Sequence, residues 1–343
     1  MRPQILYLNR LKAVACIAVV ILHTFFAADA FAQTVAQHTV LLSVRNLMTW
    51  SVPCFVMCSG VLLLEPKKEI GMQKIVKSYL PRMVIALVLF SLLFALFDSI
   101  FMQSRSVAAI LGEGLKNVIT GGGWKHMWYI YMMIALYLML PVYRLVTKSA
   151  SDKDLRYIVI LYGIFLSLAP LSEKFAGLKL PFYIFVFSIY PLFFFAGYYL
   201  HKYRRFGRVP AFLMVLVSAA ATVWLTYISC SENNENLSDL LSNYSSPVII
   251  LGSIGGFVLL RDTSEKRKGF IDAASEIISK CSFGVYLIHM AFLKFIFAVK
   301  RYDPMANGGY LTVLLISLLV FVMSLLVTYA FISVKNMFRK KAK

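Results

Sequence analysis

Apolar stretches of about 17 to 25 residues alternate with short charged segments along the whole chain, and each is long enough to cross a bilayer as a helix. The pattern therefore predicts an all-α, polytopic membrane protein with about ten transmembrane helices. The predicted spans are Lys12 to Ala28, Leu41 to Leu64, Tyr79 to Phe101, Met127 to Val146, Leu155 to Leu171, Phe182 to Leu200, Ala211 to Ser229, Ser246 to Leu260, Ser282 to Val299 and Tyr310 to Val334.

The basic residues are distributed unevenly between the two sides of these predicted spans. If the N-terminus is cytoplasmic, the segments on the inner side hold 26 of the 35 Lys and Arg residues. This asymmetry follows the positive-inside rule and predicts that both termini are cytoplasmic. The net charge of +19 is thus a topology signal first and an attraction to anionic membrane lipids second. It does not indicate a nucleic-acid partner.

The connections between spans are too short for a soluble domain, so we expect residues 1–343 to form one membrane-embedded domain. The outer connection after the third span contains a predicted short helix, Val107 to Ile119. Cleavage of the first span as a signal peptide is a competing interpretation, because Ala28-Asp29-Ala30 resembles a cleavage site, but His23 interrupts its apolar core. The five cysteines show neither a disulfide framework nor metal-ligand spacing, and no metal is predicted.

Ionisable side chains at membrane depth are expensive, so each is a functional candidate. His23 lies about 16 Å from the inner end of the first span, and His289 lies about seven residues into the ninth. Lys12 and His23 are eleven residues apart, which is three helical turns plus about 20°, so they share one helix face. This arrangement suits an elongated anionic ligand whose charged end stays at the cytoplasmic rim while its reactive end reaches the imidazole.

Simpler interpretations of these residues stay open. Lys12 could extend to the lipid headgroups, and His23 could hydrogen-bond to a neighbouring helix. Ser59 beside Gly60 could contact a ligand, although Ser and Gly are common where helices pack closely. Pro53 and Gly60 are expected to kink or thin the second span. Further candidates for lining a site are His126 and Trp128, at the outer end of the fourth span, where aromatic residues commonly gather.

Several segments together resemble the bacterial membrane-bound acyltransferase 3 family. They are the helix that ends in His23, then "VPCFVMCSG", "HMWYIYMMIALYLMLP", "PLFFFAGYYL" and "SFGVYLIH", in the family's order along nearly the whole chain. The resemblance implies a ten-helix fold in the bacterial inner membrane. It also implies transfer of an acyl group, usually acetyl from cytoplasmic acetyl-CoA, to a hydroxyl of a surface glycan or of its lipid-linked precursor. The similarity is greatest to the short members without an appended domain.

The chain departs from the family pattern at two basic positions. The family motif is Arg, ten residues, then His; His23 matches the histidine, but Lys12 stands at the Arg position. Lysine keeps the charge and loses the bidentate fork that grips phosphate. Arg10, the other candidate for donor binding, points about 220° around the helix from His23. The Arg often found just before "VP" is also missing, and Arg45, about one turn earlier, could reach the same place.

The resemblance suggests that Lys12 holds the phosphates of coenzyme A and that neutral His23 acts as the general base toward the acceptor hydroxyl. A covalent acyl-enzyme is an alternative within the same chemistry. The oxyanion stabiliser is not identified; Ser59, His126 and His289 are weak candidates. A transporter or ligand-sensing bundle is the alternative function class, since transporters also carry isolated histidines within the membrane. The sequence predicts neither the acceptor, the acyl chain length nor the oligomeric state.

Overall fold

The structure is a computed structural model that describes residues 5–68, 70–103, 106–168, 171, 188–204, 206–262 and 269–341. It is 85% helical, and the described residues contain no strand, which confirms the predicted all-α class. Eight helical segments in the described part are long and apolar enough to cross a membrane. The other two predicted spans, Leu155 to Leu171 and Phe182 to Leu200, lie partly outside the described residues.

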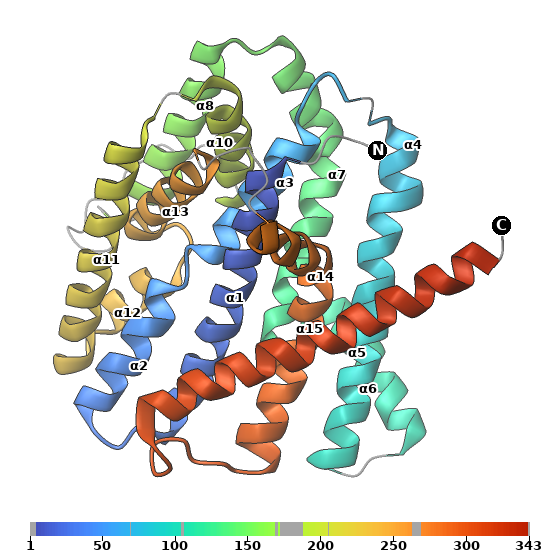
Figure 1. Ribbon diagram of the computed structural model, residues 1–343, viewed down its shortest axis with the longest axis vertical. Coiled ribbons are helices and arrows are strands. Elements are labelled where there is room, and N and C mark those ends of the chain that lie inside the picture. The colour runs from blue at the N-terminus through green and yellow to red at the C-terminus, as the bar shows by residue number, and fades with distance from the viewer. Residues whose placement is uncertain are drawn as a thin grey trace. The chain divides into compact units, whose positions relative to one another are not determined.

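The chain divides into two compact units. The first unit comprises Met1–Leu62, Ala150–Tyr286 and Asp303–Lys343. In it α1, α2, α11 and α13 lie side by side, and α15 packs across α1 (Figure 1). Its elements are α1 (Leu6–Ala28), η1 (Asp29–Phe31), α2 (Val35–Leu47), α3 (Ser51–Leu63), α8 (Asp152–Gly163), η4 (Ile164–Leu168), α10 (Tyr190–Tyr203), α11 (Arg208–Ser231), α12 (Glu235–Ser242), α13 (Pro247–Arg261), most of α14 (Gly269–Lys294) and α15 (Gly309–Lys341).

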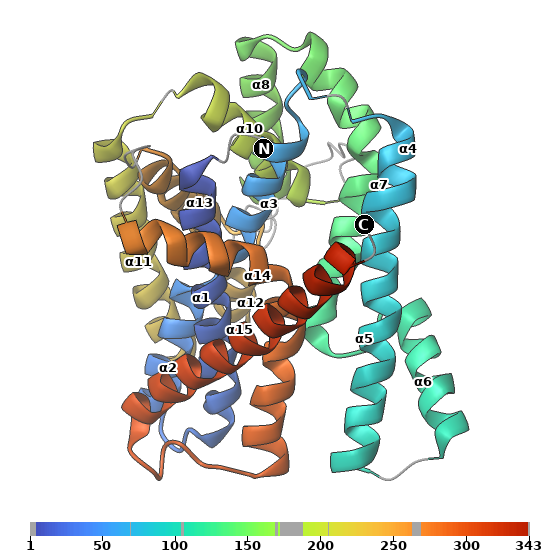
Figure 2. The same cartoon turned by 45° about the vertical axis from the view of Figure 1, so that its right-hand side comes forward.

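The second unit comprises Leu63–Ser149 and Leu287–Tyr302. Its elements are α4 (Met72–Lys74), η2 (Ile75–Tyr79), α5 (Leu80–Phe101), α6 (Val107–Thr120), η3 (Lys125–Met127), α7 (Trp128–Ser149), the end of α14 and η5 (Phe295–Val299). The short helix predicted after the third span is present as α6, which packs alongside α5 (Figure 2). Gly114 of α6 lies against Leu92, so the two helices approach closely.

Two predicted boundaries change in the structure. The second span, predicted as one stretch from Leu41 to Leu64, begins at Val35 and is interrupted at residues 48–50 between α2 and α3. The interruption precedes Pro53, which has no N–H group to donate to the carbonyl oxygen of Thr49, so the helical hydrogen-bond pattern cannot continue through this position. The helix is thus broken just before Pro53, where a kink was expected. The ninth span begins at Gly269 rather than Ser282, because α14 extends into the polar segment before it.

Two glycines allow α3 and α10 to pack backbone against backbone. A Cβ atom at Gly60 would meet the carbonyl group of Phe194, and one at Gly197 would meet the backbone of Met57. All four residues are buried. The close packing expected from Gly60 is therefore present, and it joins "VPCFVMCSG" to "PLFFFAGYYL", two segments that are far apart in the sequence.

We expect Gly60→Ala to lower the free energy of unfolding by about 1 to 3 kcal/mol. The methyl group of the new alanine must displace the backbone of α10 at Phe194, which cannot move aside as a flexible side chain can. A lower unfolding midpoint of the purified protein in detergent would confirm this. Gly71→Ala is the matched control, since a Cβ atom there meets nothing within 4 Å. Equal midpoints for the two variants would contradict the close contact.

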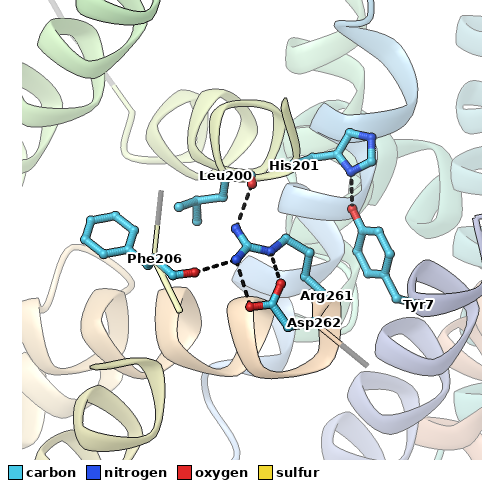
Figure 3. A network of polar contacts seen from close by, with 6 residues as sticks. All are labelled: Tyr7, Leu200, His201, Phe206, Arg261 and Asp262. Atoms are coloured by element: carbon cyan, nitrogen blue, oxygen red, sulfur yellow. Dashed lines mark hydrogen bonds and ion pairs between the residues drawn. The ribbon is translucent and has the colours of Figure 1, made fainter. Parts of the chain in front are cut away.

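Arg261 fastens the ends of α10 and α13 together (Figure 3). Its side chain is 1% exposed. Nη1 donates to the carbonyl oxygen of Leu200 at 2.8 Å, Nη2 donates to that of Phe206 at 2.5 Å, and Nε and Nη2 grip the carboxylate of Asp262 at 2.7 and 3.0 Å. All three guanidinium nitrogens thus bond within the protein, so Arg261 is explained as a structural residue.

Candidate functional site

Helix α1 places Lys12 and His23 as the sequence predicted. It runs without interruption from Leu6 to Ala28, so the eleven-residue spacing puts both side chains on one face, about 16 Å apart along the axis. Both residues are half-buried. The exposed apolar side of the same helix carries Val14 and Ile17, which are 43% and 37% exposed. Val14 and Ile17 point more than about 100° away from His23, whereas Phe26, which is 47% exposed, lies beside the face that Lys12 and His23 share.

The hydrogen bond of His23 defines which ring nitrogen can act as a base. Nδ1 lies 2.9 Å from the carbonyl oxygen of Val19, one turn earlier in α1. A carbonyl oxygen only accepts hydrogen bonds, so Nδ1 carries the proton in this contact. The neutral ring then has its lone pair on Nε2, which is the tautomer that a general base requires.

The two basic residues near the start of α1 differ in their partners. Nε and Nη2 of Arg10 donate to the carboxylate oxygens of Asp272 at 2.6 and 3.1 Å, and the two side chains are only 11% and 4% exposed. Lys12 makes no hydrogen bond or ion pair with any residue in the described part of the chain, and its charge acts on the thiol of Cys58 in α3. Of the two predicted donor-binding residues, Lys12 is therefore the better placed to receive an anionic ligand.

Arg45 lies beside the turn of α1 that carries His23. Its guanidinium carbon is 5.3 Å from the centre of the Phe26 ring, and Phe26 follows His23 by three residues. Side chains with this spacing are neighbours on a helix. The structure thus places Arg45 against the residue one helical turn beyond His23, within the first unit.

Asn46 and Ser242 hold the Arg45 side chain. Nη1 of Arg45 donates to Asn46 Oδ1 at 2.7 Å and to Ser242 Oγ at 3.0 Å. The amide nitrogen of Asn46 in turn donates to Thr226 Oγ1 in α11 at 3.0 Å. These contacts join α2, α11 and the end of α12 around one cation.

Ser59, a candidate for contacting a ligand, forms a hydrogen bond within its own helix. Its hydroxyl group donates to the carbonyl oxygen of Phe55 in the preceding turn of α3, at 3.0 Å. The hydrogen-bond donor of this hydroxyl group is therefore already used within its own helix. A ligand is therefore not needed to explain Ser59.

The remaining predicted residues belong to the second unit. The rings of His126 and His289 lie edge to face with centroids 5.7 Å apart, and the two residues are 3% and 0% exposed. Trp128 begins α7 and packs against Tyr129. The structure therefore pairs His126 with His289 within the second unit, whereas His23 belongs to the first.

Next to these histidines lies a charged cluster that the sequence analysis missed. Asp98 forms an ion pair with Lys294 and accepts a hydrogen bond from Trp124 Nε1 at 3.0 Å. Lys294 Nζ is 4.5 Å from the centre of the Trp124 ring, and Trp124 stacks on Phe94. Asp98 is an ionisable residue inside a predicted span, so the rule that singled out the histidines would also have identified it.

Comparison with known proteins gives one finding. The model of the Acyl_transf_3 family, described as an acyltransferase domain, matches residues 5–333. No curated protein and no solved structure matches the chain. Within the described residues, no group of three or more His, Cys, Asp or Glu side chains could hold a metal ion.

Proposed function

This chain belongs to the acyltransferase 3 family, and from that premise we propose that it is an O-acyltransferase of the bacterial inner membrane. It moves an acetyl group from cytoplasmic acetyl-CoA to a hydroxyl group of a surface glycan or of its lipid-linked precursor. The observation that carries the proposal is the single face of α1, which presents the basic tautomer of His23 about 16 Å from the cation of Lys12.

The donor has the shape that this face suits. Coenzyme A carries phosphates at one end and the thioester at the end of a long arm. Lys12, at the predicted cytoplasmic end of α1, binds the phosphates as a point charge, and the arm follows the helix toward His23. The acceptor hydroxyl approaches the thioester at His23.

His23 acts as the general base in the transfer. Nε2 takes the hydroxyl proton as the hydroxyl oxygen attacks the thioester carbonyl carbon, and Nδ1 stays bonded to Val19. The carbon–sulfur bond then breaks, and the proton passes from His23 to the departing thiolate. The products are the O-acetyl ester and free coenzyme A, with no net gain or loss of protons.

We expect Lys12→Ala to raise KM for acetyl-CoA about 10- to 100-fold with little change in kcat, because a charge-assisted contact to phosphate contributes to binding throughout the reaction. Lys12→Arg should bind at least as well as the native protein. Lys300→Ala, which removes an exposed cation elsewhere, is the control and should leave KM unchanged. A fall in kcat alone for Lys12→Ala would contradict this role.

The proposed activity is tested with the purified protein in lipid nanodiscs. With acetyl-CoA and glycan precursors extracted from the host membrane, it should release free coenzyme A and leave an acetyl ester on the glycan, detected by mass spectrometry. Release should require the acceptor. Binding or uptake of ligand without consumption of the thioester would overturn the proposal in favour of a transporter or sensor.

A further inference from the structure

Three buried or half-buried arginines of the first unit use their guanidinium groups differently. Arg10 and Arg261 each direct the Nε and Nη2 edge at a carboxylate, that of Asp272 and that of Asp262, with both oxygens engaged. This edge is a rigid fork of two parallel donors that suits one or two oxygen acceptors. In both residues the protein itself supplies the acceptor.

Arg45 leaves this edge without a partner in the described part of the chain. Only Nη1 is engaged, by Asn46 and Ser242. The Nε–H group is buried and has no hydrogen-bond partner there. Leaving a buried charged donor unsatisfied costs free energy, and such a group calls for an explanation such as a bound ligand. An oxygen acceptor that enters this position would satisfy it.

The unsatisfied edge is held in place before any ligand arrives. Two hydrogen bonds to Nη1 and the ring of Phe26 restrict the side chain, and Asn46 is itself fixed by Thr226. A donor fixed in this way needs no reorganisation when charge develops near it, which is the property that makes an oxyanion hole effective.

The guanidinium group lies one helical turn from the proposed base. Phe26, over which the guanidinium lies, is three residues beyond His23 on α1. We therefore propose, on the basis of the function above, that Arg45 is a catalytic residue whose Nε–H group binds the carbonyl oxygen of the donor thioester and stabilises the oxyanion formed from it.

The reaction step balances with this assignment. The acceptor oxygen bonds to the carbonyl carbon while its proton moves to Nε2 of His23, and the carbonyl electron pair moves onto the oxygen bound by Arg45. When the carbonyl re-forms, the carbon–sulfur bond breaks and His23 returns the proton to the thiolate. In this assignment Lys12 binds the phosphates of coenzyme A, His23 accepts the proton, and Arg45 stabilises the oxyanion.

The test replaces Arg45 by Lys, which keeps the charge and removes the fork. We expect kcat to fall about 10²- to 10³-fold, as for loss of one oxyanion donor, with KM values for acetyl-CoA and acceptor within about twofold of native. Arg208→Lys, an exposed arginine at the start of α11, is the matched control and should retain native kcat. Size-exclusion profiles and unfolding midpoints establish that the variants are folded.

Two results would overturn the assignment. Native kcat in Arg45→Lys would show that the fork is not used in the transition state. A raised KM for the acceptor with unchanged kcat would show that Arg45 binds an anionic group of the glycan instead. If the native protein releases no coenzyme A in the same assay, the proposed function fails first, so the two failures are distinguishable.

A measurement on the native protein does not depend on the variant's folding. Acetyl-CoA labelled with ¹³C at the carbonyl carbon is bound without acceptor, and its carbonyl stretch is recorded by infrared difference spectroscopy. A hydrogen bond from Arg45 should lower the frequency below that of acetyl-CoA in water, because it polarises the carbonyl group. A frequency equal to or above the aqueous value would overturn the assignment.

Discussion

Replacing His23 by Gln should lower kcat for acetyl transfer by about 10²- to 10⁴-fold, the contribution of a general base, while the protein still inserts and binds acetyl-CoA. Glutamine retains an amide near the position of the imidazole, but it cannot accept a proton near neutral pH. His23→Ala should show the same loss. The measurement is initial-rate release of coenzyme A by purified protein at saturating acetyl-CoA and acceptor.

Ile17→Ala provides the control for this experiment, because it truncates a residue on the exposed side of the same helix, away from the face of His23. Its kcat should be close to native. Near-native transfer by His23→Gln would refute the base assignment while leaving family membership untouched. A loss confined to KM would show that His23 binds substrate rather than moving a proton.

Replacing Arg10 by Leu should destabilise the protein by about 3 to 5 kcal/mol, because it removes a two-point ion pair from the carboxylate of Asp272, which is only 4% exposed. The unfolding midpoint in detergent should fall accordingly. Arg10→Leu/Asp272→Leu should recover most of the loss, since an apolar pair in place of a buried ion pair is often neutral or stabilising.

The double variant also separates structure from donor binding at this position. If Arg10 serves only to hold Asp272, Arg10→Leu/Asp272→Leu should keep a native KM for acetyl-CoA. A stable double variant with a strongly raised KM would instead restore Arg10 to the donor site that the sequence analysis assigned to it.

Much of the helical framework was predictable because membrane spans are long and uniformly apolar. The first, third and fourth predicted spans correspond to α1, α5 and α7, with boundaries shifted by a few residues. The extension of α2 to Val35 was less visible, since that turn is polar and lies outside the apolar stretch. The start of α14 was missed for the same reason, because hydropathy marks the membrane interior and not the end of a helix.

The candidate site was only partly predictable. His23 and His289 were found because histidine is unusual in an apolar span, whereas Asp98 and Lys294 were passed over although they lie in predicted spans too. The partner of each polar group could not be predicted. Asn46 bonds to Thr226 across 180 positions of the chain, and no local pattern links them.

The sequence by itself determined that Lys12 and His23 lie on one face of one helix, because helical geometry depends only on residues close together in the chain. Only the tertiary structure decided which cations are already neutralised. Arg10 meets a carboxylate 262 residues away, and Arg45 comes beside the turn of His23 with a donor, Nε–H, that no residue in the described part of the chain accepts from. Whether an arginine meets a carboxylate or keeps an unused donor depends on how separate helices pack. The residue type alone is compatible with both.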